Sequence, residues 1–273
     1  MTLSDAIPAP VERIAGDPAC GLLILCDHAS NAIPADYASL GMPAAELQRH
    51  IAYDIGIAET TRHLARLTGA PAVLSTFSRL LIDPNRGEDD PTLVMRLSDG
   101  AIVPGNARAD DAEVERRLDR FYRPYDRSIG EAVSAGLESG RPPAILSMHS
   151  FTPSWKGVPR PWHITVLWDA DPRFPKPLLR ALEAEGDIVV GDNEPYDGAL
   201  AGDVVNRHAT RLGLANALIE IRQDLIGEPA GCLAWAERLA RILPGILADP
   251  ALNRVERQPT RTASRHRARW TPG

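Results

Sequence analysis

Two histidines stand at the ends of apolar runs, a placement typical of a metal site. His28 follows the run that starts at Leu22, and His149 ends the run that starts at Ile145. Open α/β sheets bind ligands beyond the carboxyl ends of their strands, so two such histidines are expected at one sheet edge. Catalytic zinc takes three protein ligands and keeps one position open. We therefore predict that both histidines bind Zn²⁺ or another divalent metal, although a strand-end histidine can equally be a structural hydrogen-bonding group.

The third metal ligand has two candidates in the sequence. Asn31 lies three residues after His28, and Asp54 lies further along the chain, four residues after His50. A carboxylate is the commoner partner of two histidines in zinc hydrolases, so Asp54 is preferred.

Glu220 is a candidate general base because it lies within an apolar segment. Its neighbours are Leu218, Ile219 and Ile221. Burying a glutamate is costly unless it is paired or used. An ion pair with Arg222 or with another arginine is one explanation. A catalytic base whose pKa is raised by loss of solvent is the other.

Arg79 and Arg86 lie in a segment with apolar neighbours and are candidates for binding an anionic substrate. Arginine holds a carboxylate through two parallel hydrogen bonds, although a surface salt bridge is the alternative for either residue. His208 can bind substrate or cap a helix.

Periodicity in the sequence predicts strands that alternate with helices. The expected strands span 22–27, 72–77, 163–168, 188–190 and 216–222, with one more ending at His149. The expected helices span 44–67, with His50 and Asp54 on one face, and 110–137, 175–185, 203–212 and 233–247, with Pro124 as a kink or break. Residues 1–20 are expected to be irregular, and 152–161 to form an active-site rim. This order predicts an α/β three-layer sandwich with a mixed, mostly parallel sheet.

Length and composition favour one enzyme-sized domain with a tail. The chain has 273 residues, of which 44% are hydrophobic, and we assign 1–252 to a single domain and 253–273 to a basic, disordered tail. A net charge of -6 gives no reason to expect nucleic acid or a membrane as partner. The three cysteines form no CxxC pair, and no apolar run reaches the roughly 18 residues of a membrane span, so a cytoplasmic protein is expected.

Seven short segments resemble the N-formylglutamate amidohydrolase family and occur in the same order as in that family. The resemblance is closer to the branch often labelled predicted N-formylglutamate amidohydrolase. The seven segments run from about residue 22 to 226. The segments are Cys26-Asp27-His28-Ala29-Ser30-Asn31, His50-Ile51-Ala52-Tyr53-Asp54-Ile55-Gly56, Ser78-Arg79-Leu80-Leu81-Ile82-Asp83-Pro84-Asn85-Arg86, His149-Ser150-Phe151-Thr152-Pro153, Arg160-Pro161-Trp162, Gly191-Asp192-Asn193-Glu194-Pro195-Tyr196 and Glu220-Ile221-Arg222-Gln223-Asp224-Leu225.

The resemblance implies a phosphorylase/hydrolase-like fold, distantly similar to the zinc carboxypeptidases. It implies that His28 and His149 bind zinc and that Glu220 is the catalytic glutamate. The carboxypeptidases carry His-x-x-Glu where this chain has Asn31, whereas the amidohydrolases keep an acid at the position of Asp54, which favours Asp54.

For the substrate, the resemblance implies that Arg79 lies close to the reacting carbonyl and that Asn85 and Arg86 hold a carboxylate. The expected reaction is hydrolysis of a small N-acyl amino acid, with N-formyl-L-glutamate giving formate and L-glutamate. A second basic group would be needed for the glutamate side chain, and the candidates are Arg160, Arg207, His208 and Arg222. A zinc peptidase, a deacylase of another N-acyl amino acid, and a non-catalytic binding protein on this scaffold remain alternatives.

Overall fold

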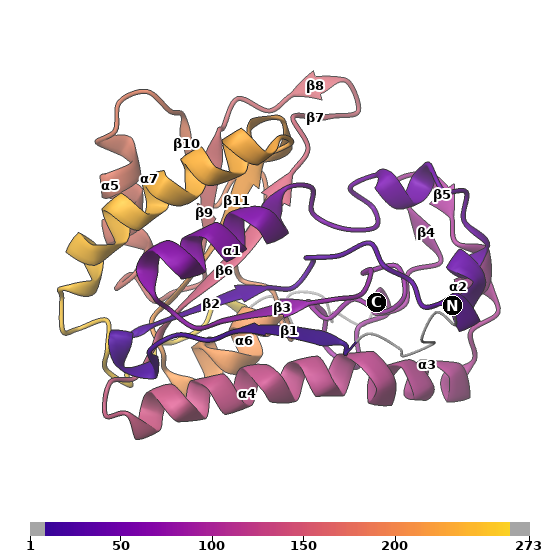
Figure 1. The fold of residues 1–273 in the computed structure, drawn as a ribbon, viewed down its shortest axis with the longest axis horizontal. Coiled ribbons are helices and arrows are strands. Elements are labelled where there is room, and N and C mark those ends of the chain that lie inside the picture. The colour runs from indigo at the N-terminus through magenta and orange to yellow at the C-terminus, as the bar shows by residue number, and fades with distance from the viewer. Residues whose placement is uncertain (1–8, 263–273) are drawn as a thin grey trace, which may run out of the picture.

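A seven-stranded sheet forms the centre of the computed structural model, which describes residues 9 to 262 (Figure 1). The strand order is β1-β3-β2-β6-β11-β9-β10. Strands β3, β2, β6 and β11 are parallel to one another, while β1 and the pair β9 and β10 run in the opposite direction. The prediction of an α/β fold with a mixed, mostly parallel sheet is therefore confirmed. The strands of this sheet are β1 Val11–Ile14, β2 Leu22–Cys26, β3 Ala72–Ser75, β6 Ala144–Phe151, β9 Ile164–Leu167, β10 Val190–Asp192 and β11 Asn216–Arg222.

The described residues also form two small hairpins and seven α-helices, with short 3₁₀ and π-helical turns between them. The hairpins pair β4 Leu97–Ser98 with β5 Ala101–Ile102 and β7 Ser154–Trp155 with β8 Val158–Pro159. The helices are α1 Ile57–Thr68, α2 Pro104–Ala107, α3 Asp111–Arg117, α4 Arg123–Glu138, α5 Pro175–Glu183, α6 Val204–His208 and α7 Pro229–Leu247. None of the described helices is long and apolar enough to cross a bilayer.

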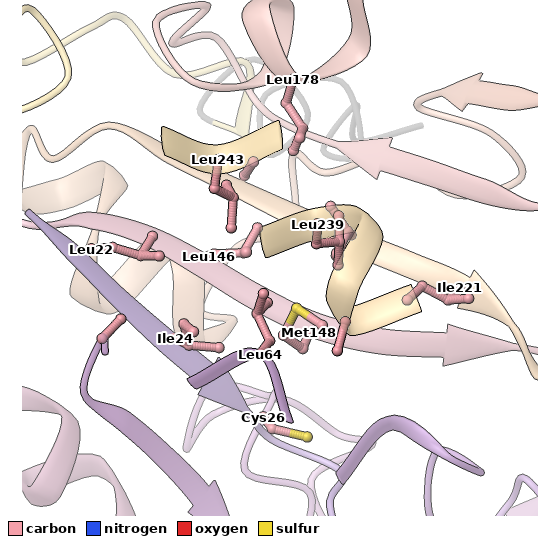
Figure 2. Packing of buried hydrophobic residues seen from close by; sticks show 14 of the residues in the cluster. Leu22, Ile24, Cys26, Leu64, Leu146, Met148, Leu178, Ile221, Leu239 and Leu243 are labelled. Carbon is pink, nitrogen blue, oxygen red and sulfur yellow. The ribbon is translucent and has the colours of Figure 1, made fainter. Parts of the chain in front are cut away.

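The sheet separates two hydrophobic cores because successive strand residues face opposite sides. Helices α1, α5 and α7 cover one face, and their side chains pack on Leu22, Ile24, Leu146 and Met148, as Figure 2 shows. Helices α4 and α6 cover the other face. Strand β6 is buried throughout, which explains why its sequence is an almost continuous apolar run rather than an alternating one.

The predicted helix over 44–67 is wrong in its first half. Only the 3₁₀ turn Glu46–Gln48 and α1, from Ile57, are helical there. Gly56 at the start of α1 has φ +79°, and a Cβ at this position would lie 1.9 Å from the Ile226 carbonyl oxygen. Only glycine fits such a position, so the chain turns sharply before α1. His50 and Asp54 consequently lie in a loop instead of on one helix face.

The other differences lie at the ends of elements. The lead-in contains β1, which pairs with β3. The predicted helix 110–137 consists of α3, the π-helical turn Leu118–Tyr122 and α4, which follow one another without a break. Pro124, predicted as a kink or break, lies directly after the π-helical turn. The predicted helix 203–212 is α6 followed by a 3₁₀ turn.

The first ten residues of the predicted disordered tail pack against the domain. Asn253 donates hydrogen bonds to the carbonyl oxygens of Gly21 and Pro142, and the backbone N–H of Arg261 donates to Asp169. The rest of the predicted tail, 263–273, lies outside the described residues.

Candidate metal centre and catalytic pocket

Strand register brings Glu220 next to His149. Strands β6 and β11 are parallel, and Glu220 is the direct partner of His149 in the pairing. Both residues share the face of Ile145 and Leu218, whose side chains belong to the core under α4. Because side chains alternate along a strand, the histidine and the glutamate project from the same side of the sheet.

Asp54 lies between His28 and His149. Its Oδ2 is 2.9 Å from Nδ1 of His149, and its Oδ1 is 3.5 Å from Nδ1 of His28. All three side chains are buried, and one ligand atom from each lies within 4.8 Å of the other two. The loop before α1 holds Asp54 there through a backbone hydrogen bond from its N–H to the His28 carbonyl oxygen. Asn31 is directed elsewhere, since its amide donates to the Leu47 carbonyl oxygen.

A buried carboxylate orients His28. Its Nε2 lies 2.8 Å from Oδ1 of Asp83, and its Nδ1 lies 3.3 Å from Nη1 of Arg79. Arginine can only donate, so Nδ1 accepts and Nε2–H donates to Asp83. Asp83 also accepts a hydrogen bond from Nη2 of Arg79 at 2.7 Å. Burial would raise the pKa of Asp83, but Arg79 and His28 outweigh it and hold that pKa well below its usual range.

A second buried carboxylate orients His149. Oδ2 of Asp27 lies 3.1 Å from Nε2 of His149, and Oδ1 accepts a 2.7 Å hydrogen bond from the hydroxyl of Tyr125 on α4. With Asp27 at one nitrogen and Asp54 at the other, His149 is held as an imidazolium in the metal-free protein. Burial alone would lower its pKa, but these two carboxylates raise the pKa of His149 to about 10.

The side chains fit a catalytic metal ion. Two imidazoles and one carboxylate are the donor set of many hydrolytic zinc sites, and both histidines present Nδ1 to Asp54. Zinc-binding histidines commonly donate their second ring N–H to a carboxylate, as His28 and His149 do here to Asp83 and Asp27. A divalent cation would take the place of the Nδ1 proton of His149.

Glu220 faces the same pocket without a hydrogen-bond partner among the described residues. Burial raises its pKa to about 7, although the positive charge of His149 opposes this. The ion pair with Arg222, which the sequence allowed, is not formed. Arg222 instead bonds Asp224 and the carbonyl oxygen of Arg160. Glu220 is therefore a carboxylate available to exchange a proton beside the candidate metal site.

The pocket has a volume of about 450 Å³ and is lined by the candidate metal ligands His28, Asp54 and His149, by Glu220, and by Asn85 and Arg86, the predicted carboxylate-binding pair. Asn85 is fixed by its side-chain oxygen, which accepts a hydrogen bond from the Val204 N–H, so its amide N–H groups are left to bind a ligand. Arg86 is held by Thr92 and by the Asn85 carbonyl oxygen. Both side chains line the pocket.

Three predicted substrate-binding residues do not line this pocket. Arg160 is enclosed by aromatic rings, and Arg222 bonds the backbone at 160–162. His208 bonds Asp126 at 2.6 Å and lines a different hollow along α4.

Sequence reasoning did not assign roles to several residues of the site. Asp27 and Asp83 stand in the matched segments, next to His28 and before Asn85, but nothing in their spacing showed which histidine each would contact. Asp203 and Tyr196 also line the pocket. Burial raises the pKa of Asp203 to about 7. The predicted rim at 152–161 supplies Thr152 and Trp155 to the pocket wall.

Comparisons with known proteins show the family and the fold of this chain. The family model described as N-formylglutamate amidohydrolase matches residues 20–227. The crystal structure of gene product Atu2144 from Agrobacterium tumefaciens is 32% identical, with a TM-score of 0.81, and the match covers 88% of this chain and 95% of that one. The N-formylglutamate amidohydrolase from Ralstonia eutropha JMP134 has the same fold at 23% identity and a TM-score of 0.66, covering 90% and 98% of the two chains. No curated protein sequence matches. Since the family model covers most of the chain, this protein belongs to the N-formylglutamate amidohydrolase family.

Proposed function

We propose that this protein is a metal-dependent hydrolase that cleaves the amide of a small N-acyl amino acid, with N-formyl-L-glutamate as the first substrate to test. One observation carries the proposal: the His28, Asp54 and His149 cluster shares a pocket with the half-buried Glu220, which has no hydrogen-bond partner among the described residues, and with the Asn85-Arg86 pair. The pocket volume of about 450 Å³ is in the range of small-molecule sites.

The metal centre and Glu220 supply the chemistry of hydrolysis. A divalent ion such as Zn²⁺, held by His28, Asp54 and His149, would polarise the amide carbonyl and lower the pKa of a water molecule. Glu220 takes the proton from the attacking water and returns it to the amide nitrogen as the C–N bond breaks. The water oxygen becomes part of the released acid, and the amino acid leaves as the amine.

Arg79 is placed to stabilise the carbonyl oxygen as it gains negative charge. Its Nη1 lies 3.3 Å from His28 and 3.9 Å from Asp54, so the guanidinium borders the metal centre. Its Nε has no hydrogen-bond partner within the described part of the chain. A fixed cation beside a developing oxyanion lowers the barrier because it requires no rearrangement during the reaction.

Asn85 and Arg86 make the hydrolase selective for amides that carry a carboxylate. Both have donors that no described residue accepts, and both line the pocket beside the metal centre. Binding the α-carboxylate here would hold the acyl group against the metal, which converts binding energy into orientation.

The test is release of a primary amine by zinc-loaded protein. The panel contains N-formyl-L-glutamate, the N-formyl and N-acetyl forms of other amino acids, and a dipeptide. Fastest turnover of N-formyl-L-glutamate supports the proposed substrate. Preference for an N-acetyl compound or for the dipeptide would instead indicate a different deacylase or a peptidase.

A matched control is the Glu220→Gln variant, which keeps the shape of the side chain but cannot take a proton. It should bind zinc and the substrate without turnover. A wild-type protein that binds no divalent metal and hydrolyses nothing in the panel would contradict the proposal and favour a binding protein.

A further inference from the structure

Three aromatic rings and two hydroxyl groups surround the guanidinium of Arg160. Its centre lies 5.7 Å from the ring centroids of Phe151 and Trp155 and 5.2 Å from that of Tyr196. Nη1 donates to the hydroxyl of Thr152 at 3.1 Å, and Nη2 donates to the hydroxyl oxygen of Tyr196 at 2.9 Å. Only 9% of the residue is exposed. These contacts fix Arg160 behind the pocket wall.

The hydrogen bond from Arg160 determines where the hydroxyl proton of Tyr196 points. Arginine is only a donor, so the phenol oxygen accepts this bond through a lone pair. The proton is then directed away from Arg160, and no acceptor for it is found within residues 9 to 262. Tyr196 itself lines the pocket. The phenol therefore presents an unused donor to the pocket.

The loop of Tyr196 is held against β9. The side-chain oxygen of Asn193 accepts hydrogen bonds of 3.0 Å from the N–H group of Trp168, the residue after β9, and from the N–H group of Gly198, two residues after Tyr196. A Cβ on Gly198 would lie 2.2 Å from the Trp168 nitrogen, so the loop approaches the strand as closely as a backbone can. The position of the phenol is thus set by the backbone as well as by Arg160.

The phenol remains a donor at neutral pH. Burial raises the pKa of Tyr196, and the charge of Glu220 across the pocket raises it further. Tyr196 lines the same pocket as Glu220, Asp54 and His149, and the α-carboxylate of the substrate is assigned to Asn85 and Arg86.

We propose that the Tyr196 hydroxyl donates a hydrogen bond to the substrate oxygen that becomes negatively charged when the amide is attacked, and that Arg160 is the positioning residue that aims it. This inference rests on the proposed amide hydrolysis. It makes Tyr196 a catalytic residue in addition to Arg79 and Glu220, and it replaces the prediction that Arg160 binds substrate.

The first experiment is a double-mutant cycle on the best substrate of the panel. Tyr196→Phe removes one donor to a developing charge and should lower kcat about 10- to 100-fold with KM changed less than about 3-fold. Arg160→Gln should also lower kcat. The double variant should be no slower than Tyr196→Phe alone, because Arg160 acts through the phenol.

Controls separate this role from general damage. Tyr37 lies outside the pocket, and Tyr37→Phe removes a hydroxyl for which the described residues provide no hydrogen-bond partner. Arg238→Gln removes an arginine that packs on Trp235 and pairs with Asp187. Both variants should leave kcat unchanged. If Arg160→Gln fails to fold, Arg160→Lys keeps the charge and a donor and takes its place in the cycle.

A second measurement does not depend on turnover. The affinity of zinc-loaded protein for acetohydroxamate, a small carbonyl compound that binds zinc, should fall about 3-fold or more in Tyr196→Phe but not in Tyr37→Phe. If the wild type hydrolyses nothing in the panel, the proposed function fails and this affinity alone decides the role of Tyr196. Unchanged affinity, a kcat within 2-fold of wild type, or additive losses in the cycle would each overturn the inference.

Discussion

Replacing Asp27 with asparagine should weaken zinc binding without removing a metal ligand. Asp27 is not one of the proposed metal ligands. It accepts hydrogen bonds from Nε2 of His149 at 3.1 Å, from Tyr125 at 2.7 Å and from Ser147 at 3.4 Å. Asparagine offers one acceptor oxygen and turns an NH₂ group towards at least one of these donors. The His149 ring then loses the partner that keeps its Nδ1 directed at the metal.

The size of the effect follows from that lost bond. A hydrogen bond to a charged group contributes about 1.5–3 kcal/mol. At about 1.4 kcal/mol for each tenfold change, this corresponds to zinc binding roughly 10- to 100-fold weaker. The same range is typical when a carboxylate behind a zinc-binding histidine is removed. Tyr125→Phe removes one bond to Asp27 rather than Asp27 itself, so its loss should be smaller.

The assay is competition between the protein and a coloured zinc chelator, with folding verified by circular dichroism. Asp126→Asn is the matched control, because Asp126 pairs with His208 at 2.6 Å in a hollow outside the catalytic pocket. That variant should bind zinc as the wild type does. A folded Asp27→Asn protein whose zinc affinity stays within 2-fold of wild type would refute the assignment of Asp27 as the group that orients His149.

Four further predictions concern the pocket. Glu220→Gln should lower kcat by about three orders of magnitude or more with zinc still bound; a near-normal rate would remove Glu220 from the mechanism. In the metal-free protein the pKa of Glu220 is raised to about 7, so ionisation of Glu220 destabilises the fold progressively from about pH 4.3 up to pH 7. Glu220→Gln should therefore raise the melting temperature more at pH 8 than at pH 4. An equal gain at both pH values would contradict this cause. His149→Ala should purify without stoichiometric zinc, as measured by elemental analysis, and full occupancy would exclude it as a ligand. Arg86→Gln should raise KM about 10-fold or more for substrates that carry an α-carboxylate, and an unchanged KM would place the carboxylate elsewhere.

The sequence predicted the strands better than the helices. Strands β2, β6 and β11 are short segments buried on both faces of the sheet. Because both faces are buried, almost every residue of such a strand is apolar, and the run can be recognised in the sequence. The apolar spacing over 44–56 also fits a helix, but those residues pack into the core under the sheet as a loop, since Gly56 requires a backbone turn that a helix does not contain. Periodicity reports burial and cannot distinguish a helix from a compact loop.

The apolar runs also indicated His28, His149 and Glu220. A polar residue directly after or within such a run is costly to bury, which suggests a functional or structural role. The partners of those residues could not be predicted in the same way. Arg160 and Arg222 stand in matched segments just as Arg79 and Arg86 do, yet only Arg79 and Arg86 line the pocket. A contact depends on the direction of a side chain, and one sequence does not contain that direction.

The order of apolar runs and turn residues thus determined an α/β domain, and the residue types determined a chemistry of histidines, carboxylates and arginines. Tertiary structure decided which groups meet: Asp54 between two imidazoles, Asp27 and Asp83 behind them, and Glu220 opposite His149 in the strand register. The physical reason is that these residues come from strands and loops up to about two hundred positions apart, and their distances are set by sheet register and core packing, which depend on the whole chain at once.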